Sequence, residues 1–179
     1  KEYYVVSTHR EENIDDKFNS INLIETLNYL EEKYKKPVIF YKHPRSMKRI
    51  NERDIKFNDY VRVMKPLGFF DYNKLQLSSF CAILDSGTIF EESSILGFPA
   101  ITIRNAHERP EGMDNGTLIM SGLKKEMVEQ AIKIVAEDSI AGYKPETVTD
   151  YNVMDVSKKV LRIIYSYTSY VKRNVWKMV

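Results

Sequence analysis

The sequence contains one cysteine, Cys81, so an internal disulfide and a metal cluster built on cysteines are both excluded. Cys81 lies within the apolar run Phe80–Leu84, where we expect a small buried side chain. A chain without a disulfide framework fits a reducing compartment, and we expect a cytoplasmic protein. No signal peptide is visible, and no apolar stretch approaches the ~20 residues of a membrane-spanning helix, so no membrane partner is expected.

Common nucleotide-binding and metal-binding motifs are absent as well. The patterns G-x-G-x-x-G and G-x-x-x-x-G-K-[ST] do not occur, so dinucleotide and P-loop sites lack support. His9, His43 and His107 lack the local spacing of metal ligands, and we predict no metal site. The formal net charge is only +2, with basic residues scattered among acidic ones. No nucleic-acid partner is therefore expected, whereas a small anionic ligand is compatible with this charge.

The composition and the order of segments indicate a packed α/β domain. Hydrophobic residues make up 43% of the chain and charged residues 29%, which argues against disorder. Amphipathic segments, such as the one carrying Leu23, Leu27 and Leu30 at helical spacing, alternate with short β-branched runs. Strands are predicted over Tyr3–Thr8, Val38–Lys42, Val61–Met64, Ala82–Asp85, Ala100–Ile103 and Leu118–Ser121. This alternation predicts a parallel sheet covered by helices on both faces.

The two ends of the chain suggest a piece of a longer protein. The chain begins at Lys1 inside a strand pattern and without an initiator Met, which we interpret as a cut fragment. A wide apolar stripe over Asp155–Met178 predicts one helix of about 36 Å, longer than one small domain needs. We therefore divide the chain into a domain over residues 1–154 and a helix over 155–179. Tyr170 and Trp176 are expected to pack outside the fragment, unless the helix lies wholly across its own domain.

Polar clusters directly follow several predicted strands, and in open parallel sheets these strand ends bind ligands. The run Thr8–Asn13 contains His9, which can transfer protons near neutral pH, and Arg10, which can bind a phosphate or carboxylate. A charged loop with a structural histidine would look the same. His43, followed by Pro44 after the second strand, has either a structural or a functional role.

The run Asp85–Glu92 links a strand to a helix and has a clear physical logic. Ser86 is predicted to be the helix N-cap, and Gly87 lets a ligand approach the backbone N–H groups that attract anions. A diphosphate would gain charge-assisted hydrogen bonds there, and Glu91 or Glu92 could accept both hydroxyls of a ribose. An ordinary capped helix is the alternative. A further run, Arg104–Gly112, forms a rigid polar loop after the fifth strand.

In this order the motifs resemble the C-terminal half of the UDP-N-acetylglucosamine 2-epimerase family. The family pattern reads T-H-R-x-E-N, H-P, P-L-x-[YF], D-S-G-x-x-x-E-E, R-x-x-x-E-R-P-E and G-T. It occurs here at Thr8–Asn13, His43-Pro44, Pro66–Phe69, Asp85–Glu92, Arg104–Glu111 and Gly116-Thr117. Each motif is modest alone, but six in the right order are specific, and the resemblance extends to the C-terminal helix.

The resemblance implies a GT-B fold of two Rossmann-like domains, of which this chain would be the second. The chain would be a three-layer α/β domain with a parallel sheet, and its last helix would cross towards the missing N-terminal domain. The family is usually dimeric and uses no redox cofactor, so we predict no cofactor and a homodimer. UDP would be eliminated from C1 as a proton leaves C2, and it would then add back with C2 inverted.

The resemblance also implies roles for individual residues. Ser86 and Gly87 would hold the UDP phosphates, Glu92 the ribose, and Arg109 the diphosphate or sugar, with Tyr72 near the uracil. A catalytic group of His9, Arg10 and Glu12 would line the cleft. His43, Arg104 and Glu108 would line a sugar-binding or allosteric part of the same cleft. The principal acid and base carboxylates would belong to the missing domain.

Three residues depart from the family pattern: Glu11, Thr88 and His107 stand where many members have Arg, Gly and Thr. The resulting variants H-R-E-E-N and H-E-R-P-E-G-M-D resemble a capsule and O-antigen branch. That branch converts UDP-2-acetamido-2,6-dideoxy-L-talose to UDP-N-acetyl-L-fucosamine. The alternatives are a UDP-N-acetylglucosamine 2-epimerase, the donor-binding domain of a GT-B glycosyltransferase, and a non-catalytic nucleotide-sugar sensor.

Overall fold

The computed structural model describes residues 3–41, 56–106 and 109–178 of the 179-residue chain. It forms two compact units, Lys1–Val148 and Thr149–Val179. The strands of the first unit are β1 (Tyr4–Ser7), β2 (Val38–Tyr41), β3 (Val61–Met64), β4 (Cys81–Leu84), β5 (Ala100–Thr102) and β6 (Ile119–Met120). Its helices are α1 (Glu11–Ile14), α2 (Lys17–Tyr34), α4 (Phe69–Ser78), α5 (Ile89–Leu96), α6 (Pro110–Asp114) and α7 (Lys125–Ala141).

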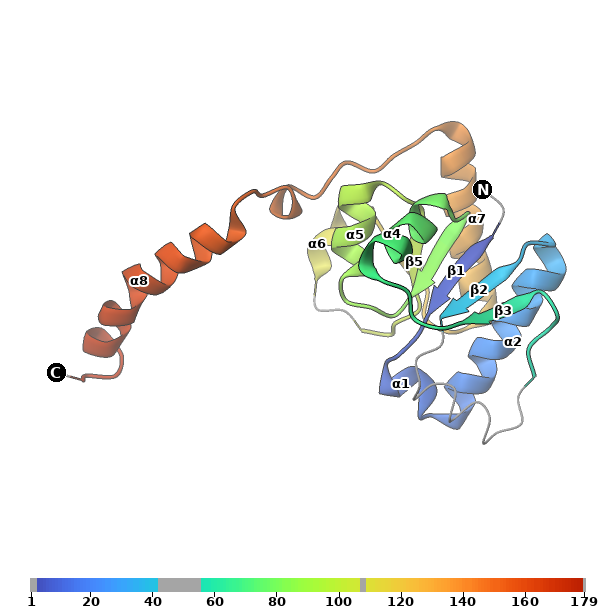
Figure 1. Cartoon of the computed structure of the whole chain (residues 1–179), viewed down its shortest axis with the longest axis horizontal. Helices are drawn as coiled ribbons and strands as arrows, with labels where there is room; N and C mark the ends of the chain where they lie inside the picture. The colour runs from blue at the N-terminus through green and yellow to red at the C-terminus, as the bar shows by residue number, and fades with distance from the viewer. Residues whose placement is uncertain (1–2, 42–55, 107–108, 179) are drawn as a thin grey trace. The chain divides into compact units, whose positions relative to one another are not determined.

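The six strands form one parallel sheet in the order β3-β2-β1-β4-β5-β6 (Figure 1). The predicted parallel sheet is confirmed, and the ends of each strand lie within one residue of the predicted ends. After β1 the chain adds β2 and then β3 on one side of the sheet, and after β4 it adds β5 and then β6 on the other side. β1 and β4 are paired directly, so the loops at their carboxyl ends flank the point where ligands bind in sheets of this order.

The strands β1, β2, β4 and β5 are largely buried, which explains why they are mainly apolar, whereas the edge strand β3 carries the exposed Arg62. Alternate side chains of β1, such as Tyr4 and Val6, join the core beneath α2 and α7, together with Leu27 of α2 and Ile132 of α7. The helices α4, α5 and α6 cover the opposite face (Figure 1). Burying one such aliphatic side chain contributes about 1.5–3 kcal/mol, so the two faces hold the sheet in place.

Helix α2 begins and ends at residues suited to those positions. Asp16 is its N-cap, and the carboxylate accepts a hydrogen bond from the backbone N–H of Asn19 at 2.7 Å. The helix ends at Lys35, whose backbone is left-handed (φ 51°) and whose N–H donates to the carbonyl of Glu31.

The second unit contains a short 3-10 turn, η1 (Thr149–Tyr151), and helix α8 (Val156–Asn174). Helix α8 has 19 residues and is therefore about 28 Å long. The prediction that it continues to Met178 was wrong, because the chain leaves the helix after Asn174 and Lys177 adopts a left-handed backbone (φ 53°). No residue of α8 is buried. Among the described residues, no helix has the length and apolarity to cross a membrane.

The replacement Leu27→Ala tests the packing of α2 on the sheet. Leu27 is fully buried, so the truncation leaves a cavity and should lower the free energy of unfolding by about 2–5 kcal/mol. Urea unfolding followed by circular dichroism measures the loss. Glu25→Ala changes an exposed position of the same helix and should cost at most about 0.5 kcal/mol. Equal losses in the two variants would contradict the described packing.

Candidate active site

Asp85 follows β4 and is completely buried at the carboxyl edge of the sheet. Its carboxylate accepts hydrogen bonds from Thr8 Oγ1 at 2.6 Å, from the backbone N–H groups of His9 and Arg10 at 3.1 and 3.0 Å, and from Asn13 Nδ2 at 3.1 Å. These donors all belong to the loop and short helix that follow β1. A buried carboxylate is stable only when its oxygens have such partners, so Asp85 fixes the shape of this loop.

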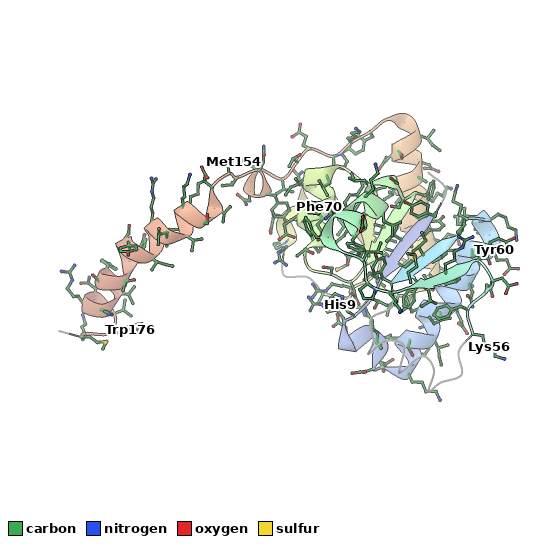
Figure 2. The ribbon with its side chains drawn as sticks, viewed as in Figure 1. His9, Lys56, Tyr60, Phe70, Met154 and Trp176 are labelled. Atoms are coloured by element: carbon green, nitrogen blue, oxygen red, sulfur yellow. The ribbon has the colours of Figure 1, made fainter. Side chains whose placement is uncertain are left out.

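His9 is oriented by the same carboxylate. Its Nδ1 lies 3.0 Å from Asp85 Oδ1, and its side chain is 45% exposed. Because Nδ1 donates to Asp85, the carboxylate fixes the orientation of the imidazole ring. Figure 2 shows His9 beside the carboxyl end of β1. A half-buried imidazole of fixed orientation therefore lies at the point where the strand order reverses.

The pair titrates in a way that favours charge on both groups. The hydrogen bond to Asp85 raises the pKa of His9 above its ordinary value, although burial and the neighbouring Arg10 and Arg104 oppose the shift. Burial by itself raises the pKa of Asp85, but hydrogen bonds from His9 and Thr8 outweigh it and the net pKa is lowered. Asp85 therefore remains ionised at neutral pH, where it stabilises the imidazolium form of His9.

Helix α5 begins beside this pair. Its N-cap is Thr88 (φ −75°, ψ −8°), and no side chain of the described residues caps its first N–H groups. The prediction that Ser86 is the N-cap was wrong, because the turn after Asp85 takes two more residues before the helix starts. Ser86 Oγ instead accepts a hydrogen bond from the N–H of Thr88 at 3.3 Å. The start of α5 thus keeps N–H groups that can bind an anion.

Two guanidinium groups lie over Gly87. A Cβ atom at this position would lie 2.8 Å from a terminal nitrogen of Arg109 and 3.8 Å from one of Arg10. Arg109 is held in place by Glu91, whose carboxylate oxygen lies 2.7 Å from its Nε. Gly87 therefore lets both guanidinium groups approach the start of α5. Together with the helix N–H groups, they create an anion-binding position without a larger basic patch.

An open pocket of about 310 Å³ lies next to this anion-binding position. Tyr72 packs edge-on against Tyr41, with ring centroids 4.8 Å apart, and burial raises the pKa of its hydroxyl. Phe69, at the pocket rim, is 74% exposed. The lining residues are Ser7, His9, Tyr41, Pro66, Leu67, Phe69, Tyr72, Ser86, Thr88 and Glu92. Aromatic walls and a carboxylate suit a planar base and a diol.

The remaining predicted residues lie around the same edge or outside the described part of the chain. Arg104 follows β5, is only 4% exposed, and has its Nε 4.0 Å from a carboxylate oxygen of Glu12. His43 and Glu108 lie outside the described residues, so their predicted place in the cleft stays a prediction. Within the described part of the chain, no cluster of three potential metal ligands occurs.

The sequence reasoning did not assign a role to Asp85, Gln76 or Phe69. The sequence did contain a sign of the role of Asp85. An acidic residue directly after a buried apolar strand needs hydrogen-bond donors, because burying a carboxylate without them is costly. Phe69 belonged to a motif already noted. The sequence did not indicate a role for Gln76, because a single amide in an amphipathic helix is usually exposed. In the structure Gln76 is completely buried.

The chain matches the family model described as UDP-N-acetylglucosamine 2-epimerase over residues 1–165. This chain belongs to that family. The UDP-N-acetylglucosamine 2-epimerase of Methanocaldococcus jannaschii is 34% identical over 138 residues, which cover 75% of this chain and 38% of the relative. The chain thus spans well under half the length of this curated relative.

Solved structures of epimerases in the family have the same fold. The UDP-N-acetylglucosamine 2-epimerase of Rickettsia bellii superposes with a TM-score of 0.81 at 44% identity, covering 98% of this chain and 47% of that chain. The M. jannaschii enzyme in complex with UDP-GlcNAc and UDP gives a TM-score of 0.80 at 29% identity, covering 92% and 45%. The first unit is therefore the Rossmann-like C-terminal half of a GT-B-type two-domain fold.

The titration of His9 tests the Asp85 contact. In the chain, NMR of the imidazole should give a pKa above about 6.5, and Asp85→Asn should lower it because the stabilising carboxylate charge is lost. The stability gained from protonating His9 should be fully present below about pH 6.5 and disappear as the pH rises through the folded-state pKa. Glu12→Gln is the control and should leave the titration of His9 unchanged. A wild-type pKa at or below 6.5 would contradict the pairing.

Proposed function

We propose that this chain is the UDP-binding half of a non-hydrolysing UDP-sugar 2-epimerase. The observation that carries the proposal is the convergence of Arg109 and Arg10 over Gly87 at the start of α5, beside a pocket with aromatic walls. A nucleoside diphosphate has the matching parts: a dianionic diphosphate, a ribose diol and a planar base. The family's name and the UDP-containing complex of the M. jannaschii relative support this choice of ligand.

The ligand's three parts correspond to three groups of residues. The diphosphate would take the N–H groups near Ser86 and Gly87 and the guanidinium groups of Arg10 and Arg109. The ribose would bind Glu92. The uracil would lie against Tyr72, with the exposed ring of Phe69 free to close over it. Each charge-assisted hydrogen bond to the phosphates contributes more than a neutral one, which compensates for the small net charge of the chain.

In the proposed reaction, the C1–O bond to UDP breaks as the C2 proton leaves, which forms a glycal with a C1–C2 double bond. A UDP oxygen then adds back to C1 while a proton is delivered to the opposite face of C2, which inverts C2. This half of the enzyme would stabilise the charge that develops on the departing diphosphate. His9 would contribute its Nε2 hydrogen, because Asp85 holds the imidazole by Nδ1 and raises its pKa. Arg10 would add a fixed positive charge, and Glu12 beside Arg104 would orient the sugar end of the cleft. No redox cofactor enters this scheme.

The rest of the enzyme would come from a missing N-terminal domain. The share of the relatives that this chain covers supports that proposal. Helix α8 would cross to that domain and bury its apolar stripe there, through residues such as Val160, Ile164 and Tyr167, each about half exposed. A homodimer of the complete enzyme is part of the same proposal.

Two substrates have specific support. The variants at Glu11 and His107 favour UDP-2-acetamido-2,6-dideoxy-L-talose, for surface polysaccharide biosynthesis, as the finer assignment. The names of the relatives favour UDP-N-acetylglucosamine. We propose the 6-deoxy substrate, and the specificity constants of the complete enzyme for both UDP-sugars decide between them. A higher kcat/KM for UDP-N-acetylglucosamine would overturn this assignment while leaving the epimerase proposal intact.

Gly87→Ala should weaken UDP binding about tenfold, equivalent to ~1.4 kcal/mol. The added methyl group would meet the Arg109 guanidinium at 2.8 Å and displace it, and a flexible side chain can move without unfolding the protein. Isothermal titration calorimetry with UDP measures the effect. Gly68→Ala is a matched control, since a Cβ there meets nothing within 4 Å. Unchanged UDP affinity in Gly87→Ala would place the diphosphate elsewhere.

The 179-residue chain alone should bind UDP weakly but should not exchange the C2 proton of either UDP-sugar. Removing that proton and returning one to the other face needs positioned acid and base groups, each typically contributing about 100- to 10,000-fold. The family resemblance assigns those carboxylates to the missing domain. NMR in deuterated water follows the exchange, with the complete enzyme as the positive control. Deuterium at C2 with this chain alone would show that it carries its own acid–base groups.

A further inference from the structure

Glu92, the proposed ribose ligand, is held by two neutral donors from different elements. Thr88 Oγ1 donates to Oε1 at 2.7 Å, and Gln76 Nε2 donates to Oε2 at 3.0 Å. Thr88 precedes the same helix, whereas Gln76 lies on α4 and is completely buried. Both oxygens of the carboxylate are therefore fixed before any ligand binds.

The orientation of the Gln76 amide follows from its surroundings. If the amide were turned over, its carbonyl oxygen would face the Glu92 carboxylate, and two acceptors would repel each other. The end of α4 is itself anchored, because the Gln76 carbonyl accepts hydrogen bonds from Ser79 Oγ and N–H at 2.7 and 3.1 Å. The side chain of Gln76 thus points a donor at Glu92 from a rigid part of the core.

Glu91 and Glu92 are adjacent in sequence but differ in their partners. Glu91 forms the ion pair with Arg109. Among the residues that the structure describes, no cation forms an ion pair with Glu92, so no neighbouring positive charge neutralises its carboxylate. Each carboxylate oxygen can accept about two hydrogen bonds, and Thr88 and Gln76 take one on each. One acceptor position on each oxygen is left, which matches two neighbouring hydroxyl groups.

We propose that Thr88 and Gln76 are positioning residues that hold Glu92 for the cis-diol of a ribose, and so make this site select ribonucleotides over 2′-deoxyribonucleotides. The proposal rests on the proposed UDP-binding function. It also gives a role to Thr88, which stands where many members of the family have glycine. A glycine has no hydroxyl, so this chain fixes the carboxylate with a contact that those members lack at this position.

Calorimetry of the 179-residue chain with UDP and with 2′-deoxy-UDP tests the proposal. The wild-type chain should prefer UDP by about tenfold or more, because the deoxy ligand leaves an acceptor of Glu92 unpaired. Thr88→Val removes the hydroxyl at nearly constant shape and should weaken UDP binding about three- to tenfold. The affinity for 2′-deoxy-UDP should change much less. Thr88→Ser keeps the hydroxyl and should restore the preference.

Thr88 is exposed and makes no side-chain cap bond, so its valine variant should fold normally. Gln76→Met tests the second donor and should also reduce the preference for UDP. Glu92→Gln should abolish the preference, which establishes the role of Glu92 itself.

If Glu92→Gln loses the preference but Thr88→Val and Gln76→Met keep it, the positioning role is wrong and the UDP site stands. Equal weakening of both ligands by Thr88→Val would also overturn it. No UDP binding by the wild-type chain would overturn the proposed function instead.

Discussion

An ionised carboxylate that is removed from water needs several hydrogen-bond donors, and Asp85 obtains them from the loop after β1. This requirement joins two loops that are more than 70 residues apart, at the point where the strand order reverses. It also orients His9 and fixes where the turn to α5 begins. The anion-binding position over Gly87 and the pocket beside it both depend on that turn, so one buried carboxylate aligns the whole edge.

The site gathers positive charge locally in a chain that is nearly neutral. Arg109, paired with Glu91, lies over a glycine at the start of a helix whose N–H groups point the same way. Fixed dipoles and guanidinium groups of this kind need little reorganisation when a leaving group acquires charge. Glu92 instead accepts hydrogen bonds from two neutral donors, Thr88 and Gln76, which leave the negative charge of its carboxylate in place. In the proposed function, the same short segment, Ser86–Glu92, would provide both the diphosphate site and the diol site.

Much of the fold could be predicted from the sequence, because buried parallel strands are largely apolar and helices repeat every 3.6 residues. The motifs after β1 and β4 were also expected to lie together at one edge of the sheet, where the structure places them. The contacts of Asp85 could not be predicted, since pairing with Thr8 depends on the spatial order of the strands. The N-cap was predicted wrongly at Ser86 because the sequence does not show how many residues the turn between β4 and α5 contains. Gln76 was missed because burial of one amide depends on how α4 packs.

The central claim is that the start of α5 binds the diphosphate of UDP. A crystal structure of this chain with UDP tests it most directly. The account predicts phosphate oxygens within hydrogen-bond distance of Ser86, Gly87 and Arg109, with the ribose hydroxyls on Glu92. A diphosphate bound elsewhere, such as in the cavity of about 150 Å³ lined by Phe98 and Tyr143 at the opposite edge of the sheet, would contradict it.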